Sequence, residues 1–126
     1  MKTILVVDDE KDDLESMYQI LENAGYAVLT ANDGTQALET LGKHNVDVIL
    51  LDIMMPTLSG YDLLRILHEK IYHKIPVVFV SIQPEKEVDT TQVDGFVQKP
   101  FAPSTLVQTI NEVIANFKQT MGWKTK

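Results

Sequence analysis

VDVILLDIMMP, residues 46–56, carries apolar side chains at five of its first six positions and then an acid, Asp52. An unbroken apolar run of this kind is typical of a β-strand that is buried on both faces. Burying an unpaired carboxylate costs several kcal/mol, so an acid is out of place inside such a strand. We therefore expect Asp52 to lie at the open end of the strand or beside a positive charge.

The rest of the chain alternates short apolar runs with segments of helical periodicity. Four further strands are expected at 3–7, 26–31, 76–81 and 94–98. Apolar residues at helical spacing predict a helix that Gly25 stops, a second through 37–41, and a third over about 59–70. A last helix is opened by Pro103 and ends near Met121.

Strands that alternate with helices and are apolar throughout imply a parallel sheet covered by helices on both faces. With right-handed crossovers this pattern gives a five-stranded, doubly wound α/β fold. A chain of 126 residues suffices for one sizeable core, so we expect one domain over 1–121 and a short tail over 122–126. The segment 84–95 has few branched apolar residues and two adjacent threonines, so the helix there should be short or irregular.

Composition excludes several classes of function. With 18 acidic against 11 basic residues and a formal net charge of -7, the chain is repelled by nucleic-acid backbones and anionic lipids. The absence of cysteine removes disulfides, thiolate metal sites and cysteine nucleophiles, and is typical of a reducing compartment. The first ten residues hold an apolar run of only four, too short for a signal peptide, and no segment is long enough to cross a bilayer. We expect a soluble, cytoplasmic protein that binds neither nucleic acid nor membranes.

Reactive side chains follow four of the five predicted strands. They are Asp8 and Asp9 after the first strand, Asp52 at the end of the third, Ser81 at the end of the fourth and Lys99 after the fifth. Because the carboxyl ends of parallel strands meet at one edge of a sheet, these side chains should lie close together. Clustered carboxylates repel one another unless a cation neutralises them, and Mg²⁺ prefers such oxygen ligands. The ammonium and hydroxyl groups supply donors for phosphoryl oxygens, which makes Asp52 a candidate nucleophile that forms an aspartyl phosphate.

Each of these residues also has an ordinary structural interpretation. Acids after a strand often cap the following helix, which would account for Asp8, Asp9 or Asp52 taken singly. Ser81 is equally a strand-end serine and Lys99 a solvated surface lysine. The convergence of all five on one predicted edge favours the phosphorylatable site. The three histidines share no metal-binding spacing and are expected at the surface; they are His44, His68 and His73.

Taken in order, these motifs resemble the response-regulator receiver domains of two-component signalling. The resemblance is carried by VDDE (7–10), LDIMMP (51–56), Ser59-Gly60, Ser81, DGF (94–96) and KPF (99–101). It covers essentially the whole chain and implies a flavodoxin-like, CheY-like sheet with strand order 2-1-3-4-5. It further implies that Asp52 is the phosphoacceptor and a ligand of Mg²⁺, with Mn²⁺ as an alternative. Asp9 would bind the ion directly, Asp8 through water and Met54 through its backbone carbonyl.

The resemblance assigns the remaining roles as well. Ser81 becomes the switch hydroxyl, Phe96 the switch aromatic and Lys99 the cation that binds the phosphoryl group, and the Lys99-Pro100 peptide bond is implied to be cis. The implied partners are a sensor histidine kinase or histidine phosphotransfer protein and a downstream protein that the sequence does not name. Such a receiver is a signalling module rather than a turnover enzyme, and a monomer or a weak phosphorylation-dependent dimer.

Three departures from the family pattern concern the switch rather than the acids. The residue after the switch hydroxyl is usually small in receivers, whereas Ile82 should crowd the phosphorylation pocket. Lys99 follows Ser81 by 18 positions, about one helical turn fewer than the family pattern. Phe96 stands where a tyrosine hydroxyl would report the switch position by hydrogen bonding.

Two hypotheses from different classes remain open. The first is a stand-alone receiver whose output runs through a partner, through relay to another histidine, or through a region outside this sequence. The second is a degenerate receiver that serves as a constitutive protein-interaction module without phosphorylation, which Ile82 and the shortened segment favour. A nucleotide-binding or phosphohydrolase domain is disfavoured because no phosphate-binding glycine loop follows any strand.

Overall fold

The computed structural model describes residues 1–55, 58–70 and 74–124, and of residues 118–124 the backbone only. Pro56, His73 and the side chain of Met121, all named above, lie outside this description. The elements are β1 (Thr3–Val7), α1 (Lys11–Asn23), β2 (Ala27–Ala31), α2 (Gly34–Lys43), β3 (Val48–Asp52), α3 (Gly60–Glu69), β4 (Val77–Ser81), the 3-10 turn η2 (Glu85–Glu87), β5 (Gly95–Gln98) and α4 (Pro103–Lys124).

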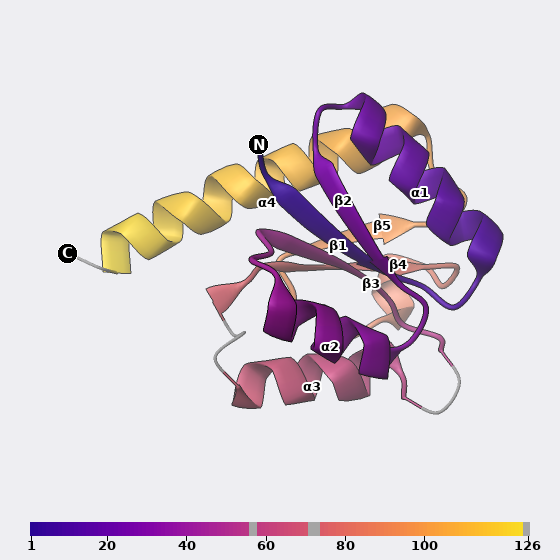
Figure 1. Cartoon of the computed structure of the whole chain (residues 1–126), viewed down its shortest axis with the longest axis horizontal. Helices are drawn as coiled ribbons and strands as arrows, with labels where there is room; N and C mark the ends of the chain where they lie inside the picture. The colour runs from indigo at the N-terminus through magenta and orange to yellow at the C-terminus, as the bar shows by residue number, and fades with distance from the viewer. Residues whose placement is uncertain (56–57, 71–73, 125–126) are drawn as a thin grey trace.

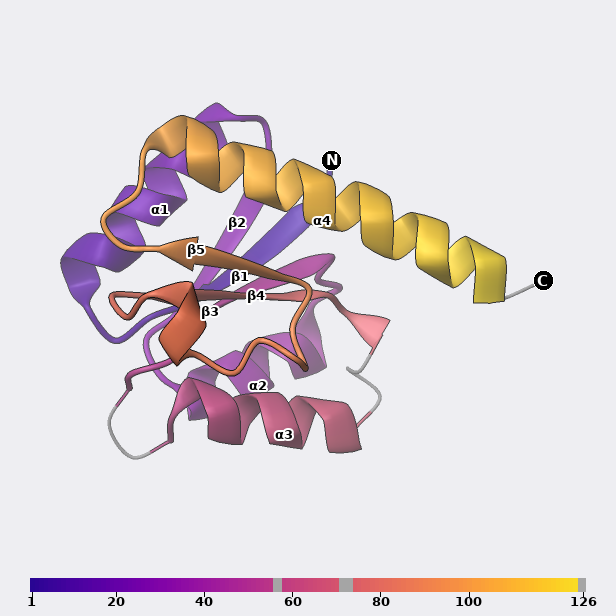
Figure 2. The same ribbon diagram turned by 180° about the vertical axis from the view of Figure 1, so that it is seen from behind.

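The five strands form one parallel sheet in the order β2-β1-β3-β4-β5, as predicted. Helices α1 and α4 cover one face of the sheet and α2 and α3 cover the other (Figure 1). The view from behind shows the same two layers, with α4 running past the edge of the sheet (Figure 2). This is the doubly wound arrangement in which the carboxyl ends of all strands share one edge.

Successive residues of a strand pack into the two cores alternately, because neighbouring side chains of a β-strand point to opposite faces of the sheet. In β3, Val48 and Leu50 pack toward α1 and α4, whereas Ile49 and Leu51 pack toward α2 and α3. Every residue of β3 and β4 is buried, which confirms that the uninterrupted apolar runs mark strands covered on both faces. The two cores fix the register of the strands and therefore the positions of the residues at their ends.

The backbone at the end of β3 leaves room for no side chain at Gly60. A Cβ atom on Gly60 would lie 2.6 Å from the carbonyl oxygen of Asp52 and 2.7 Å from Cα of Ile53. The Gly60 N–H donates to the Ile53 carbonyl at 2.8 Å, and the Ser59 hydroxyl caps the new helix by accepting from the Asp62 N–H at 3.2 Å. The Ser59-Gly60 pair thus starts α3 directly against the strand end that carries Asp52.

Two segments between the strands bear on the predictions. Between β4 and β5 the described chain forms only the turn η2, so the expectation of a short or irregular helix over 84–95 is confirmed. Gly25 ends α1 with a φ of 96°, a conformation that favours glycine.

The last helix runs further than the sequence indicated. Helix α4 continues to Lys124, beyond the end expected near Met121, so the division into 1–121 and 122–126 does not coincide with a helix end and stays a prediction. No helix within the described ranges is long and apolar enough to cross a membrane.

Candidate functional site

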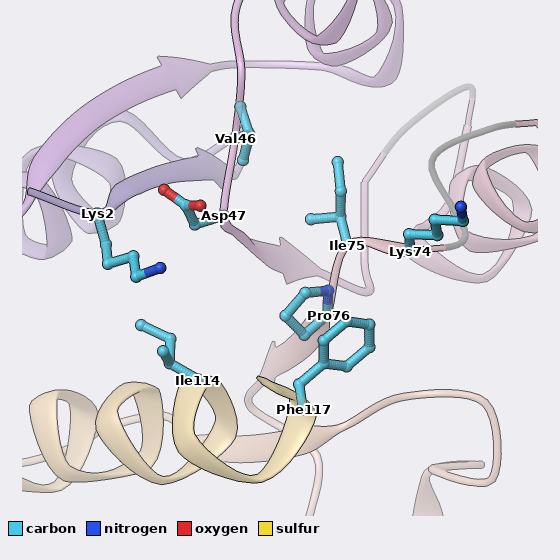
Figure 3. Close-up of a pocket in the computed structure, with 8 residues that line it drawn as sticks. All are labelled: Lys2, Val46, Asp47, Lys74, Ile75, Pro76, Ile114 and Phe117. Carbon is cyan, nitrogen blue, oxygen red and sulfur yellow. The ribbon is translucent and has the colours of Figure 1, made fainter. Parts of the chain in front are cut away.

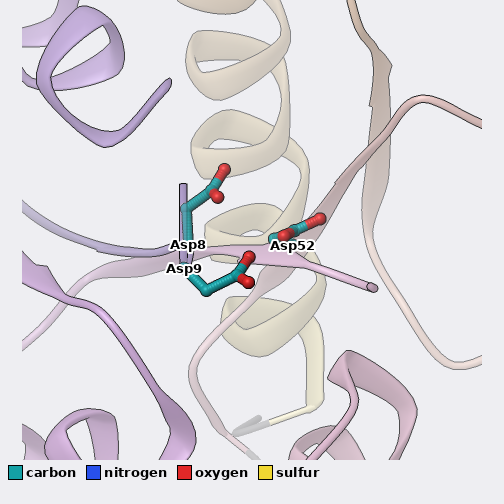
Figure 4. Close-up of side chains that lie close together, drawn as sticks. All are labelled: Asp8, Asp9 and Asp52. Atoms are coloured by element: carbon teal, nitrogen blue, oxygen red, sulfur yellow. The ribbon is translucent and has the colours of Figure 1, made fainter. Parts of the chain in front are cut away.

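Three acids converge at the carboxyl edge of the sheet. Asp8 follows β1 directly, Asp9 comes next, and Asp52 is the last residue of β3. One carboxylate oxygen from each lies within 4.8 Å of the other two (Figure 4). Since β1 and β3 are neighbours paired in parallel, the sheet itself brings together residues that are more than forty positions apart in sequence. We call Asp8, Asp9 and Asp52 the acidic cluster.

Asp52 is held in a largely buried position, with 7% of its surface exposed. Its Oδ1 accepts a hydrogen bond from the Met54 N–H at 3.3 Å. Burial and the neighbouring charge of Asp8 raise the pKa of Asp52 to about 7, against the opposing effects of Lys99 and the Met54 N–H. A carboxyl group with this pKa changes its protonation state near neutrality, and a cation that neutralises the cluster would favour its ionised form.

The other two acids differ in their access to solvent. Asp8 is fully buried, and its Oδ1 accepts from the Glu10 N–H at 2.9 Å while its Oδ2 accepts from Lys99 Nζ at 2.8 Å. Asp9 is exposed. Asp9 is therefore the member of the cluster most open to solvent, and its role as a direct metal ligand stays a prediction.

Lys99 lies beside the cluster, as predicted from its place after the fifth strand, and its closest partners are Asp8 and Asp13. Its Nζ lies 2.8 Å from Asp8 Oδ2, 2.8 Å from Asp13 Oδ2 and 4.0 Å from Asp52 Oδ1. Burial alone would lower the pKa of Lys99, but hydrogen bonds to Asp13 and Asp8 and the charges of Asp52 and Asp8 together raise it. The ammonium thus stays charged and is bound to Asp8 and Asp13 rather than to Asp52.

Asp13 was missed by the sequence analysis. It lies in the first turn of α1, where acids are expected simply because they favour a helix N-terminus. The signal that was available is the density of acids just after β1, where five of the six residues 8–13 are acidic. Only the packing of α1 beside the end of β5 shows that one of these acids reaches Lys99.

Ser81 ends β4 and is fully buried. Its hydroxyl oxygen accepts from the Gln83 N–H at 3.0 Å, and its carbonyl accepts from the Lys99 N–H at 2.7 Å. The hydroxyl hydrogen takes no part in either bond and remains a donor. Ser81 and Lys99 are therefore linked through the backbone at the ends of neighbouring strands.

The remaining predicted residues surround this edge. Met54 is 56% exposed and follows Asp52 closely enough for its N–H to reach the carboxylate. Phe96, in β5, is half-buried and packs against the core beneath α2 and α3. The Lys99-Pro100 peptide bond is cis, as expected. Ile82 is 66% exposed and lines a hollow of about 430 Å³ together with Asp13 and Lys99.

The donor set of the acidic cluster suits a hard divalent cation. Three carboxylates supply oxygen ligands, and burial together with the charge of Asp8 keeps the pKa of Asp52 raised despite the nearby Lys99. Mg²⁺ needs few protein ligands because it keeps several waters, and the three carboxylates fit that requirement.

A second hollow, of about 240 Å³, lies at the opposite end of the strands (Figure 3). Asp47 and Pro76, which precede β3 and β4, contribute to it, and Phe117 of α4 lies against Pro76. The Asp47 carboxylate is engaged there by the Thr3 N–H at 2.8 Å. This hollow is separated from the acidic cluster by the length of the sheet.

Comparisons with known proteins agree with this geometry. The family model described as the response regulator receiver domain matches residues 4–111. The response regulator SaeR of Staphylococcus aureus is 34% identical over 125 residues, covering 94% of this chain and 53% of that protein. The chain thus spans about half the length of the curated relatives it matches.

Solved structures give the same result for the fold. The chemotaxis protein CheY4 of Vibrio cholerae superimposes with a TM-score of 0.83 at 32% identity, covering 90% of this chain and 98% of that chain. The response regulator TrrA of Thermotoga maritima, solved in complex with Mg²⁺-BeF, gives a TM-score of 0.81 at 29% identity, covering 90% of this chain and 99% of that chain.

Proposed function

The chain belongs to the response-regulator receiver family, and from that premise we propose that Asp52 accepts a phosphoryl group from a phosphohistidine of a partner protein. The observation that carries the proposal is the geometry at Asp52. Its carboxylate lies within 4.8 Å of those of Asp8 and Asp9 and 4.0 Å from the Lys99 ammonium. A buried nucleophile between a cation-binding pair of acids and a lysine is the arrangement that phosphoryl transfer to a carboxylate requires.

In the forward reaction a carboxylate oxygen of Asp52 attacks phosphorus, a P–O bond forms, and the P–N bond to the donor imidazole breaks. The leaving imidazole takes up a proton from solvent. In a separate hydrolysis reaction, water oxygen attacks phosphorus and the P–O bond to Asp52 breaks. The Asp52 carboxylate is the leaving group, inorganic phosphate is released, and the proton of the attacking water passes to solvent or to phosphate. Asp52 must be ionised to attack, so any cation that lowers its pKa from about 7 promotes the reaction.

The surrounding residues hold charge and protons in place. Asp8, Asp9 and Asp52 would bind Mg²⁺, with the Met54 carbonyl as a further ligand, and the ion when bound neutralises the negative charge of the carboxylates and phosphoryl oxygens. Lys99 donates to a phosphoryl oxygen from its place beside the cluster, and Ser81 does so with its hydroxyl hydrogen. Both donors are fixed by the ends of β4 and β5.

The chemistry is a switch rather than a turnover activity. We propose that a sensor histidine kinase or a histidine phosphotransfer protein supplies the phosphoryl group in the cytoplasm. The output is a change in protein contacts, with Phe96 and Ser81 as the switching residues. Because the curated relatives are about twice as long as this chain, the output of the whole protein is also part of the proposal.

A second candidate is a receiver that acts as a constitutive interaction module. It is favoured by Ile82, whose branched side chain lies beside the site, and by the reduction of the segment before β5 to the turn η2. The intact cluster and Lys99 oppose it.

Phos-tag electrophoresis separates the two functions. The wild type and Asp52→Asn are incubated with MgCl₂ and either acetyl phosphate or a phosphorylated histidine phosphotransfer protein. The proposal predicts a retarded, hydroxylamine-sensitive band for the wild type with at least one donor, and none for Asp52→Asn. A wild type that stays unlabelled with both donors would contradict the proposed phosphorylation and favour the interaction module.

A further inference from the structure

The Lys99 ammonium is shared between two elements that flank the site. It has three N–H donors, and two of them are directed to carboxylates at 2.8 Å, those of Asp8 and Asp13. At 4.0 Å, Asp52 is beyond hydrogen-bond distance from the same nitrogen. The cation that should serve the phosphoryl group is therefore engaged elsewhere before any phosphoryl group arrives.

Asp13 stands apart from the acidic cluster. It comes from α1 and not from a strand end, and it shares the 430 Å³ hollow with Lys99 and Ile82. Its side chain is 43% exposed, whereas that of Lys99 is 11% exposed. A charge-assisted hydrogen bond thus runs from a mostly buried ammonium to a carboxylate that solvent still reaches. Such a bond holds the ammonium in place and yet can be exchanged for another anion.

We propose that Asp13 is a positioning residue that holds the Lys99 ammonium toward α1 and competes for it with a phosphoryl group on Asp52. This inference rests on the proposed function of Asp52. It adds a residue to the reaction that does not touch the reacting atoms but sets where the phosphoryl-binding cation lies.

The competition follows from charge. Two carboxylates already compensate the single positive charge of Lys99. The ammonium therefore attracts a phosphoryl group less strongly than it would without these carboxylates. Asp8 is fully buried and is also held by the Glu10 N–H, which makes it the firmer partner. Asp13 is the partner that Lys99 can lose more easily, because water can solvate the exposed Asp13 carboxylate. Removing its charge should therefore strengthen the binding of an anion at Asp52.

The test measures the binding of beryllium fluoride, a phosphoryl mimic, to the full chain in MgCl₂ by backbone amide NMR. The variant Asp13→Asn removes the charge with little change of shape. Asp12→Asn is the matched control, because it makes the same charge change on the neighbouring residue of the same helix turn. Asp13→Glu restores the carboxylate on a longer side chain. The spectra also report whether each variant is folded.

We expect Asp13→Asn to bind beryllium fluoride about two- to fivefold more tightly than the wild type, a range set by the solvent exposure of Asp13. Asp12→Asn and Asp13→Glu should stay close to the wild type. Equal or weaker binding by Asp13→Asn, or the same gain in Asp12→Asn, would overturn the role of Asp13 and leave the proposed function intact. Failure of the wild type itself to bind would overturn the proposed function and this inference together.

Discussion

Asp52 is a buried carboxyl group that faces a second buried acid, Asp8, and this pairing has a consequence for stability. In the unfolded chain Asp52 ionises near its ordinary pKa of 3.8, whereas in the folded, metal-free protein its pKa is about 7. Between these values the folded state binds the extra proton, so the free energy of unfolding falls as pH rises from about 4 to about 7. Above pH 7, where Asp52 is ionised in both states, the folded state carries the full free-energy cost of this buried charge.

Replacing Asp52 should remove this penalty. In EDTA at pH 8, we expect Asp52→Asn to be more stable than the wild type by about 2 to 4 kcal/mol, with most of the difference gone by pH 4. Urea unfolding across this pH range measures it, with Asp12→Asn as a surface control. A difference that does not vary with pH would show that Asp52 is not the buried, repelled acid described here.

Ile82 offers a second test at the scale of one residue. Its side chain is 66% exposed, so Ile82→Ala should change the free energy of unfolding by no more than about 0.5 kcal/mol. The sequence predicts that this branched side chain narrows the approach to phosphorus, so the variant should speed both labelling by acetyl phosphate and spontaneous dephosphorylation. Phos-tag electrophoresis measures both rates. If neither rate changes, Ile82 does not limit access to the phosphorylation site.

At the scale of elements, the junction between β3 and α3 positions Asp52, the proposed nucleophile. Gly60→Ala would place Cβ 2.6 Å from the Asp52 carbonyl oxygen, a backbone atom that cannot move aside by rotation. We expect a loss of about 1 to 3 kcal/mol in urea unfolding and shifted amide signals around Asp52.

Gly42 is the matched control for Gly60. It also lies in a helix, α2, but no described atom approaches its Cβ position within 4 Å. Gly42→Ala should therefore be neutral or stabilise by up to about 1 kcal/mol. A Gly60→Ala variant as stable as Gly42→Ala would contradict the close packing of α3 on the end of β3.

The strands and helices also show how much of the fold and of the site could be predicted from the sequence. Apolar runs bounded by turn residues located all five strands, and the parallel topology then placed Asp8, Asp9 and Asp52 at one edge. These predictions depended on local pattern and on a rule of topology. The contact between Asp13 and Lys99 depends on how α1 packs beside the end of β5, which no local pattern encodes, so the sequence missed it. The extension of α4 to Lys124 was missed because the apolar stripe ends at Met121 and is followed by Gly122, a residue typical of helix ends.

For the whole molecule, the site places Asp8, Asp13 and Asp52 within 4.0 Å of one ammonium, with Asp9 beside two of these acids, in a chain of net charge -7. A divalent cation should relieve this repulsion and stabilise the folded state. For a dissociation constant of Mg²⁺ at the acidic cluster in the millimolar range, 10 mM MgCl₂ should raise the free energy of unfolding by about 1 kcal/mol relative to its value in EDTA.

Amide NMR locates the ion in the same samples. Signals near Asp8, Asp9 and Asp52 should move with MgCl₂, and Asp9→Asn should suppress both the shifts and the added stability. Shifts confined to other acidic surfaces, or stabilisation that survives in Asp9→Asn, would place the cation elsewhere.

The central claim is that the fold makes Asp52, and no other acid, the phosphoacceptor. Borohydride reduces an aspartyl phosphate to homoserine with release of phosphate, so tandem mass spectrometry after reduction identifies the labelled residue. After incubation with MgCl₂ and the better donor from the Phos-tag experiment, homoserine should be found at position 52 alone. Homoserine at position 8 or 9, or none in protein that carries phosphate, would contradict the account.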